Sequence, residues 1–162
     1  MQSRALQLLE LQDTPEHILG MRDLTAQFHE EFGGSREYDG AAIVYSAKQF
    51  FKGDPDRKFS NAWIVLDEEA VVGILYATAP RVVYSWRQIA KQEMFYVAKE
   101  YRGSRAAFML IKAFEAWAKA LNCEQVYMSV EHNMLDDLTK KTSALMQKAG
   151  YKLRGYYHIK FL

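Results

Sequence analysis

The hydrophobic pattern changes its period sharply within residues 93–121. The run from Met94 to Val97 is short, apolar and rich in aromatics, which is typical of a buried strand. A polar turn with one glycine follows at residues 99–104, and from Arg105 onward apolar residues recur at helical spacing. The predicted apolar face of this helix consists of Ala106, Leu110, Ala113, Phe114, Trp117 and Leu121. The pattern predicts a strand, a turn and a helix whose first N–H groups can bind an anion.

The rest of the chain alternates between strand and helix patterns. The predicted elements are a strand at 4–11, a helix from Pro15 to a stop at Gly33-Gly34, a short helix at 46–51, strands at 61–67 and 71–79, the strand, turn and helix described above, a strand at 124–131, a helix from Leu138 to a stop at Gly150, and a strand at 151–161. This order predicts an α/β fold of the α+β kind, with helices flanking a twisted, mixed and mostly antiparallel sheet. Residues 93–130 form its strand–helix–strand crossover.

Two segments without a clear period are candidate walls of a substrate pocket. Residues 33–60 carry Glu37, Asp39 and Asp54, which are able to attract a cation. Residues 81–91 form a loop or continue the strand before them. Long surface segments in compact domains are often functional, and the alternative for residues 33–60 is a variable connection without a ligand.

Composition narrows the class of protein. A chain of 162 residues with 49% apolar and 25% charged residues is expected to form one domain, residues 1–162, with a substantial core. The net charge of +1 gives no reason to expect nucleic acid or an anionic membrane as a partner. No apolar run reaches the roughly 18 residues of a membrane span. The single cysteine, Cys123, excludes an intramolecular disulfide and favours a reducing cytoplasm.

The histidines do not indicate a metal site. His17 and His29 lie in the first predicted helix, and no second ligand has a matching spacing. His158 falls on the polar face of the last predicted strand. We expect these three of the four histidines at the surface, and no metal.

The turn at residues 102–107, together with the element order, resembles the GNAT superfamily of acyl-CoA-dependent N-acetyltransferases. The acyl-CoA turn of that family reads Arg/Gln-x-x-Gly-x-Gly/Ala. Arg102 matches its first position, Ala107 matches its last, and Arg105 stands where the middle glycine is usual. With the closing Ala149-Gly150-Tyr151, the turn also resembles GNAT-like proteins of tailed phages and prophages.

The resemblance implies roles for two groups of residues. Val97, Ala98 and Lys99 would pair with the pantetheine arm of acetyl-CoA, with the N–H of Val97 facing the thioester carbonyl as the oxyanion donor. The backbone of the turn would face the pyrophosphate, through Arg102, Gly103, Ser104, Arg105, Ala106 and Ala107. Arg105 fits this role if its φ angle is negative and its side chain points outward, where it can add a contact to a phosphate.

The resemblance also suggests acid–base groups. Glu93 matches the place where some members carry a glutamate base, and the alternative is a solvent-exposed carboxylate at a strand end. Met146 occupies the expected place of the tyrosine that protonates the CoA thiolate. Tyr151, Tyr156 and Tyr127 are possible substitutes, and nothing in the sequence chooses among them. Asn133 follows the fifth main strand, where the family often places an asparagine near CoA, or it caps a loop.

The leading hypothesis is an N-acetyltransferase that moves acetyl from acetyl-CoA, as co-substrate, to a primary amine of a small molecule or a protein. The alternative is a catalytically weak or silent GNAT-fold protein that binds CoA or regulates. A third hypothesis, nucleic-acid binding through Arg102 and Arg105, fits poorly with the net charge. We expect a cytoplasmic protein of a bacterium or a phage-infected host, with no membrane partner and with a homodimer through the last strand as an open option.

Overall fold

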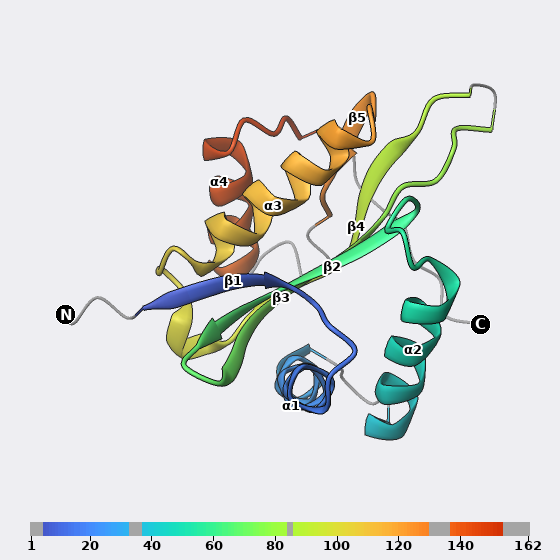
Figure 1. The fold of residues 1–162 in the computed structure, drawn as a ribbon. Helices are drawn as coiled ribbons and strands as arrows, with labels where there is room; N and C mark the ends of the chain where they lie inside the picture. The colour runs from blue at the N-terminus through green and yellow to red at the C-terminus, as the bar shows by residue number, and fades with distance from the viewer. Residues whose placement is uncertain (1–4, 33–36, 84–85, 130–136, 154–162) are drawn as a thin grey trace. The chain divides into compact units, whose positions relative to one another are not determined.

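The computed structural model describes residues 5–32, 37–83, 86–129 and 137–153 (Figure 1). The chain divides into two compact units, Met1–Tyr127 and Met128–Leu162. The first unit holds the sheet and three α-helices, and the second holds one α-helix. That the whole chain forms one domain stays a prediction.

The first unit is built on one five-stranded sheet in the order β1-β2-β3-β4-β5. Its strands are β1 (Leu6–Glu10), β2 (Ser60–Asp67), β3 (Ala70–Thr78), β4 (Ile89–Val97) and β5 (Gln125–Tyr127). Neighbours from β1 to β4 are antiparallel, and only β4 and β5 are parallel. The helices are α1 (Pro15–Phe32), α2 (Gly40–Gly53), the 3-10 helix η1 (Lys99–Tyr101) and α3 (Ala106–Ala120), with α4 (Asp137–Lys148) in the second unit. The predicted mixed, mostly antiparallel sheet is confirmed, and so is the crossover through α3.

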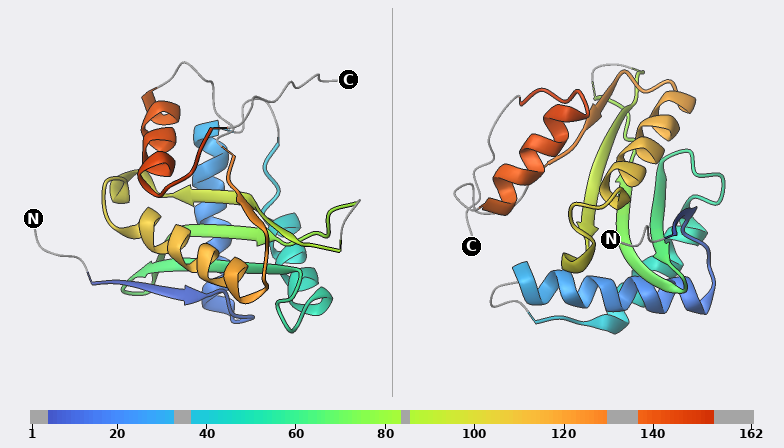
Figure 2. Two further views of the ribbon diagram at one scale, coloured as in Figure 1. Left: turned by 90° about the horizontal axis from the view of Figure 1, so that it is seen from above. Right: turned by 90° about the vertical axis from the view of Figure 1, so that its left-hand side faces the viewer.

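The helices of the first unit cover both faces of its sheet. Figure 2 shows α1 and α2 on one face and α3 on the other. Strand β2 therefore has apolar side chains on both sides, with Ile64 facing α1 and Trp63 facing α3. This double burial explains why β2 has a continuous apolar sequence without alternation.

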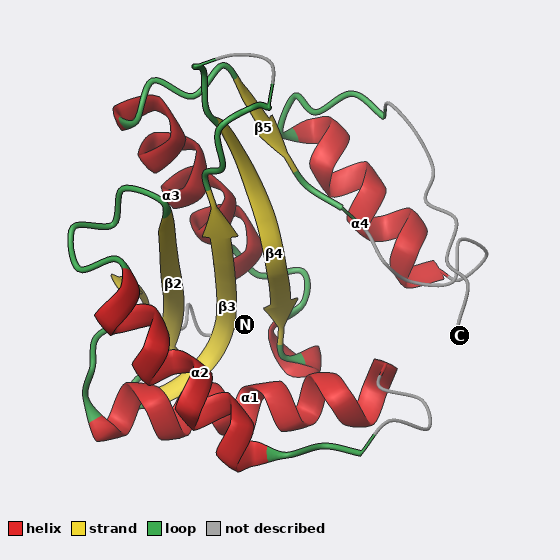
Figure 3. Cartoon of the chain, turned by 90° about the vertical axis from the view of Figure 1, so that its right-hand side faces the viewer, coloured by secondary structure: helices red, strands yellow, loops and turns green. Residues whose placement is uncertain are grey.

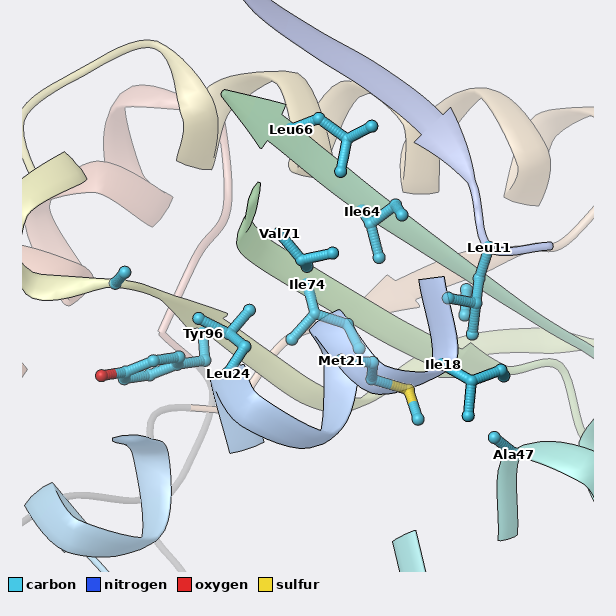
Figure 4. Close-up of a cluster of buried hydrophobic side chains, with 12 residues drawn as sticks. Leu11, Ile18, Met21, Leu24, Ala47, Ile64, Leu66, Val71, Ile74 and Tyr96 are labelled. Carbon is cyan, nitrogen blue, oxygen red and sulfur yellow. The ribbon is translucent and has the colours of Figure 1, made fainter. Parts of the chain in front are cut away.

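Figure 4 shows the core between the sheet and helices α1 and α2. Leu24, Ile64 and Ile74 are at most 2% exposed, and each such side chain contributes about 1.5–3 kcal/mol on burial. On the other face, the rings of Trp63, Phe114 and Trp117 lie within 6.4 Å of one another. These two apolar layers fix the position of β4, from which the candidate site is built.

Two element predictions are wrong in their extent. The short helix predicted at 46–51 is the 14-residue helix α2, and the carboxylate of Asp39 caps its start by accepting from the N–H groups of Ala41 and Ala42. Strand β4 begins at Ile89, not near Met94, because it pairs with β5 from Ile89 and with β3 from Lys91. Residues 81–91, predicted to be a loop or to continue the strand before them, do not continue β3: Ile89, Ala90 and Lys91 begin β4, and an isolated bridge joins Arg81 to Gln88.

The buried face of α3 differs from its predicted face. Ile111 and Ala118 are buried, whereas Ala113 and Trp117 are half-buried. Trp117 uses its position at the edge of the core to donate its indole N–H to the carbonyl of Arg57 at 2.8 Å. Hydrophobic periodicity does not reveal this polar contact. The predicted apolar face was therefore centred too close to Trp117.

The second unit supports one prediction and leaves another open. Gly150 ends α4 with a φ of 93°, and the N–H of Tyr151 reaches the carbonyl of Met146 at 3.0 Å. This is the glycine stop that the sequence predicts. The strand predicted at 151–161 is absent from residues 151–153, and its remainder lies outside the described residues. The described part of β5 is shorter than the strand predicted at 124–131.

None of the described helices combines the length and the apolar character that crossing a membrane requires. The cytoplasmic location stays a prediction.

One close approach in the first unit can be tested directly. A Cβ on Gly20 of α1 would overlap the Cγ2 methyl of Val71, whereas a Cβ on Gly53 of α2 would meet nothing within 4 Å. We expect Gly20→Ala to lower the free energy of unfolding by about 1–2 kcal/mol, because overpacking outweighs the gain in helix propensity. Gly53→Ala should leave it unchanged or raise it by up to about 1 kcal/mol. Urea unfolding of both variants measures this, and equal effects would contradict the close packing of α1 on β3.

Candidate functional site

The candidate site begins at the edge of β4 that faces away from β3. Strand β5 pairs only with Ile89, Ala90 and Lys91, and no other strand of the described chain pairs with this edge. Figure 3 shows β4 continuing past the end of β5. Within the described chain, the part of β4 that follows Glu93 is therefore open to a partner on this side.

Hydrogen-bond geometry shows which backbone groups point to the open edge. The N–H of Ala98 donates to the carbonyl of Val72 at 2.9 Å, and Val97 lies opposite Gly73. In an antiparallel pair this makes Val97 a residue without hydrogen bonds to β3, so its N–H and C=O point the other way. Phe95, two residues earlier, has the same direction. The sequence analysis named Val97 but missed Phe95, which the two-residue repeat of a strand predicts.

Glu93 lies in a β-bulge. Ala77 pairs with Gln92 and Tyr76 pairs with Met94, so Glu93 is the extra residue of β4. Its carboxylate accepts from the hydroxyl of Thr78 at 2.7 Å and pairs with the ammonium of Lys91 at 3.3 Å. The prediction that Glu93 stands at the start of its strand is wrong, since the strand begins four residues earlier.

The bulge determines the face on which Glu93 lies. Tyr76 and Met94 pack on the core beneath α1 and α2, and Thr78 shares the face of Tyr76 on β3. The carboxylate of Glu93 is hydrogen-bonded to Thr78, so Glu93 lies on this face too. Two consecutive residues, Glu93 and Met94, can share one face because a β-bulge interrupts the alternation of side chains. Burial raises the pKa of Tyr76, and the negative charges of Glu93 and Asp54 raise it further.

The turn after β4 uses half of its N–H groups internally. The N–H of Arg102 donates to Lys99, that of Ser104 donates to Tyr101, and that of Ala106 donates to the Ser104 hydroxyl. The N–H groups of Gly103, Arg105 and Ala107 have no acceptor in the described part of the chain. Three of the six predicted donors are thus free for a ligand at the start of α3.

The backbone conformation of the turn suits both Gly103 and Arg105, and for Arg105 it is the negative φ that was expected. Gly103 has a φ of 83°, where glycine is favoured, and a Cβ there would meet nothing within 4 Å. Arg105 has a φ of −73° and a ψ of −8°, so an arginine is unstrained at this position. Its guanidinium donates to the carbonyl of Leu6 in β1 at 3.1 Å. The expected outward side chain of Arg105 is therefore engaged with the protein itself.

Arg102 also has a partner that the sequence analysis missed. Its guanidinium forms a bidentate pair with Glu31 of α1, at 2.7 and 2.5 Å, and its Nε donates to the carbonyl of Val97 at 3.1 Å. The hydroxyl of Tyr96 donates to the same carboxylate at 3.1 Å. The sequence does contain a signal for this contact, because Glu31 stands seven residues after Leu24 and three after Phe28, on the apolar face of α1.

These contacts change three pKa values. The hydrogen bond from Arg102 lowers the pKa of Glu31, although partial burial opposes this effect. The same hydrogen bond raises the pKa of Arg102. Burial, followed by the hydrogen bond to Glu31, raises the pKa of Tyr96 to about 12. Glu31 and Arg102 thus carry opposite full charges at neutral pH, and Tyr96 stays a hydrogen-bond donor.

Two of the three carboxylates proposed to attract a cation are already used within the protein. Asp54 is buried and accepts from the N–H groups of Lys58, Phe59 and Ser60 at 2.6–3.0 Å. Asp39 caps α2. Only Glu37 remains exposed and without such a role.

Other predicted residues are placed as follows. His17 accepts the N–H of Gln12 at 3.1 Å. The ring of His29 lies 5.5 Å from that of Tyr38, and its Nε2 atom is buried. Neither histidine is therefore the freely exposed residue that we predicted.

The hydroxyl of Tyr127 donates to the side chain of Gln125. Met146 lies in α4 as predicted. Asn133, Tyr156 and His158 lie outside the described residues. The described residues contain no cluster of His, Cys, Asp and Glu able to hold a metal ion.

Comparison with known proteins gives a family and a fold. The sequence profile of the Acetyltransferase (GNAT) family matches residues 20–137. No curated protein sequence matches significantly. These matches give no support to the narrower resemblance to phage and prophage proteins.

Three solved structures illustrate the similarity. Glucosamine-6-phosphate N-acetyltransferase from Arabidopsis thaliana has a TM-score of 0.75 at 10% identity, covering 97% of this chain and 98% of its own. Ribosomal-protein-alanine N-acetyltransferase from Brucella melitensis biovar Abortus has 0.70 at 14%, covering 97% and 99%. An aminoglycoside acetyltransferase from an uncultured soil metagenomic sample, in complex with sisomicin, has 0.68 at 14%, covering 97% of both chains. At these identities the likeness concerns the fold, and it confirms the predicted GNAT-like architecture.

The role of Asp54 gives a prediction with a definite pH dependence. Burial opposes its ionisation, but the N–H groups of Phe59, Ser60 and Lys58 outweigh burial and hold the pKa of this carboxyl below its ordinary value. Its stabilising contribution is therefore present above the unfolded-state pKa and is lost as the pH falls through the lowered folded-state value. We expect Asp54→Asn to cost about 1–3 kcal/mol of unfolding free energy at pH 7 and less below about pH 4.

The matched control is Asp56→Asn, which removes an exposed carboxylate paired with Lys58 at 3.2 Å. This change should cost less than about 0.5 kcal/mol at either pH. Urea unfolding at pH 7 and pH 3 measures both variants. A cost for Asp54→Asn that does not shrink in acid would show that its carboxylate charge is not what stabilises the segment.

Proposed function

Because the chain belongs to the GNAT acetyltransferase family, we propose that it transfers the acetyl group of acetyl-CoA to a primary amine. The observation that carries this proposal is the open edge of β4, which leads directly to a turn with three unpartnered N–H groups. An extended arm that ends in a pyrophosphate needs this combination of a free strand edge and an anion site.

Each part of the ligand has a proposed set of contacts. The pantetheine arm lies along Val97, Ala98 and Lys99 and pairs with the open edge as an added strand. The N–H groups of Gly103, Arg105 and Ala107 face the pyrophosphate. Arg102, Ser104 and Ala106 support them by closing the turn with their own N–H groups. This division replaces the expectation that all six N–H groups point at the ligand.

The chemical step is a direct attack. The acceptor nitrogen adds to the thioester carbonyl carbon, and the N–H of Val97 stabilises the negative charge that develops on the carbonyl oxygen. The amine proton passes to Glu93, directly or through water. The C–S bond then breaks, the amide is released and CoA leaves as a thiolate. A thiolate is a stable leaving group, so the step proceeds even where no side chain protonates it.

Glu93 is suited to its role by its position on the sheet. The bulge turns its carboxylate toward the face of α1 and α2, where a cationic amine meets its charge. Lys91 occupies this carboxylate in the structure. The ammonium group of an acceptor therefore competes with Lys91 for the carboxylate of Glu93. Its attraction to this carboxylate is the stronger one when the bound acceptor is shielded from water.

A second candidate function is that of a CoA-binding protein with weak or no catalysis. Met146, which cannot donate a proton, favours it because a tyrosine is usual at the position that it resembles. The other reason for this candidate, an arginine in place of a glycine, is weakened by the unstrained conformation of Arg105. We therefore place transfer ahead of silent binding.

The acceptor is proposed only as a primary amine. Three proteins with similar folds are described as acting on an amino sugar phosphate, a ribosomal protein and aminoglycosides, so the fold does not select one class. A homodimer through residues 151–161 stays a prediction.

The first test concerns binding at the turn. We expect isothermal titration calorimetry to detect CoA binding by the unmodified protein, and Gly103→Ala to weaken it roughly tenfold, because a φ of 83° costs alanine about 1–2 kcal/mol and the free turn relaxes to another conformation that must be reversed on binding. Gly150→Ala is the matched control, since it carries a similar backbone cost at a φ of 93° outside the turn. A folded protein that binds no CoA would refute the proposal.

The second test concerns the base. We expect Glu93→Gln to lower kcat/KM by at least about 100-fold in an assay of CoA release with a panel of amines, because proton transfer is lost while the shape is kept. Glu115→Gln, which removes a partly exposed carboxylate of α3 paired with a lysine at 2.8 Å, should leave the rate within about twofold. Unchanged turnover in Glu93→Gln would remove Glu93 from the mechanism.

A further inference from the structure

We infer that Glu31, on helix α1, is a positioning residue for the acyl-CoA site, because it holds Arg102 and through it the carbonyl of Val97 and the turn. The inference rests on the proposed function. It concerns a residue outside the turn motif and 71 positions away from Arg102 in sequence.

The guanidinium of Arg102 connects three elements. Two of its nitrogens bind the two oxygens of Glu31, and its Nε binds the carbonyl of Val97 at 3.1 Å. Its plane also lies near the ring of Tyr96, with its central carbon 5.4 Å from the ring centre. The last turn of α1, the end of β4 and the first residue of the turn are thereby fixed to one another.

The ion pair is better protected than the other arginine–carboxylate pairs of the described chain. The side chains of Arg102 and Glu31 are 25% and 28% exposed, against 66% and 42% for Arg87 and Glu124. Bidentate geometry and partial burial strengthen such a contact, whereas exposed pairs contribute little. Tyr96 adds a third hydrogen bond to the carboxylate.

The contact acts where the ligand is proposed to bind. The carbonyl of Val97 belongs to the same residue as the proposed oxyanion donor, and it lies on the same edge of β4. Holding this carbonyl fixes the orientation of the residue, including its N–H. Arg102 also begins the turn whose free N–H groups face the pyrophosphate. A loosened Arg102 therefore disturbs both ends of the proposed arm site.

The pair also determines how Arg102 uses its charge. With Glu31 present, the guanidinium is neutralised and acts as a brace. Without Glu31, the same guanidinium is free to turn toward a phosphate. The two roles predict opposite effects of removing the carboxylate charge: weaker CoA binding if Arg102 is a brace, and tighter binding if its charge is being withheld from the ligand.

The experiment compares Glu31→Gln with Glu124→Gln, the carboxylate of the exposed Arg87 pair. We expect Glu31→Gln to raise the CoA dissociation constant and the KM for acetyl-CoA about tenfold and to lower kcat, because the N–H of Val97 is held less firmly, with the KM for the acceptor within about threefold. Glu124→Gln should leave all four within about twofold. Tyr96→Phe, which removes only the third hydrogen bond, should raise the KM for acetyl-CoA by a smaller factor in the same direction.

A readout without ligand accompanies the binding data. Hydrogen exchange in the CoA-free protein should become faster for the amides of residues 97–107 in Glu31→Gln and not in Glu124→Gln. Thermal unfolding and circular dichroism establish that each variant is folded.

Each remaining outcome overturns the inference. If the unmodified protein binds CoA and Glu31→Gln binds it equally well or more tightly, the brace is wrong while the proposed function stands. A loss of thermal stability in Glu31→Gln without a change in the KM for acetyl-CoA would show a purely structural role. If the folded, unmodified protein binds no CoA, the proposed function fails and the inference fails with it.

Discussion

The backbone of β4 is the constraint on which the rest of the first unit depends. Residues Ile89, Ala90 and Lys91 pair with β5, and beyond them the described chain shows β4 paired only with β3. Backbone donors and acceptors that lie beside a protein core need partners, from the protein, from water or from a ligand. The bulge at Glu93 follows closely after Lys91, the last residue of β4 that pairs with β5. The loss of pairing with β5 and the change in the direction of the Glu93 side chain therefore occur at the same place in β4.

The apolar layers make this open edge possible. Strand β4 is held on one side by β3 and covered by α1 and α3, whose buried residues Leu24 and Phe114 are at most 1% exposed. These contacts hold the end of β4 in place where the described chain provides no strand on its other side. Three residues of the proposed ligand site, Val97, Ala98 and Ala106, are also buried core residues, so the site is built directly on the core.

Local patterns were sufficient to predict the strand, the turn and the helix around residues 93–121, because a change from period 2 to period 3.6 is visible in sequence. They also indicated the glycine stop at Gly150. The start of β4 was missed because Ile89 and Ala90 depend on pairing with β5, which is not local. Helix α2 was predicted too short because the cap at Asp39 was taken for a charge that attracts a ligand. Glu31 was missed because a contact between α1 and the turn depends on the tertiary fold, although its place on an apolar helix face is a usable signal.

The bond from Arg102 to the carbonyl of Val97 has a consequence for association between chains. An open strand edge can be extended by any polypeptide, and proteins protect such edges from aggregation. A peptide strand pairs by giving and receiving hydrogen bonds in alternation, so it needs both the N–H and the C=O of Val97. Arg102 occupies the C=O and leaves the N–H. The edge therefore accepts a partner whose carbonyl receives the N–H of Val97. It disfavours a partner that must also donate an N–H to the carbonyl of Val97. A β-strand of another chain needs both bonds, whereas a small ligand needs only the first.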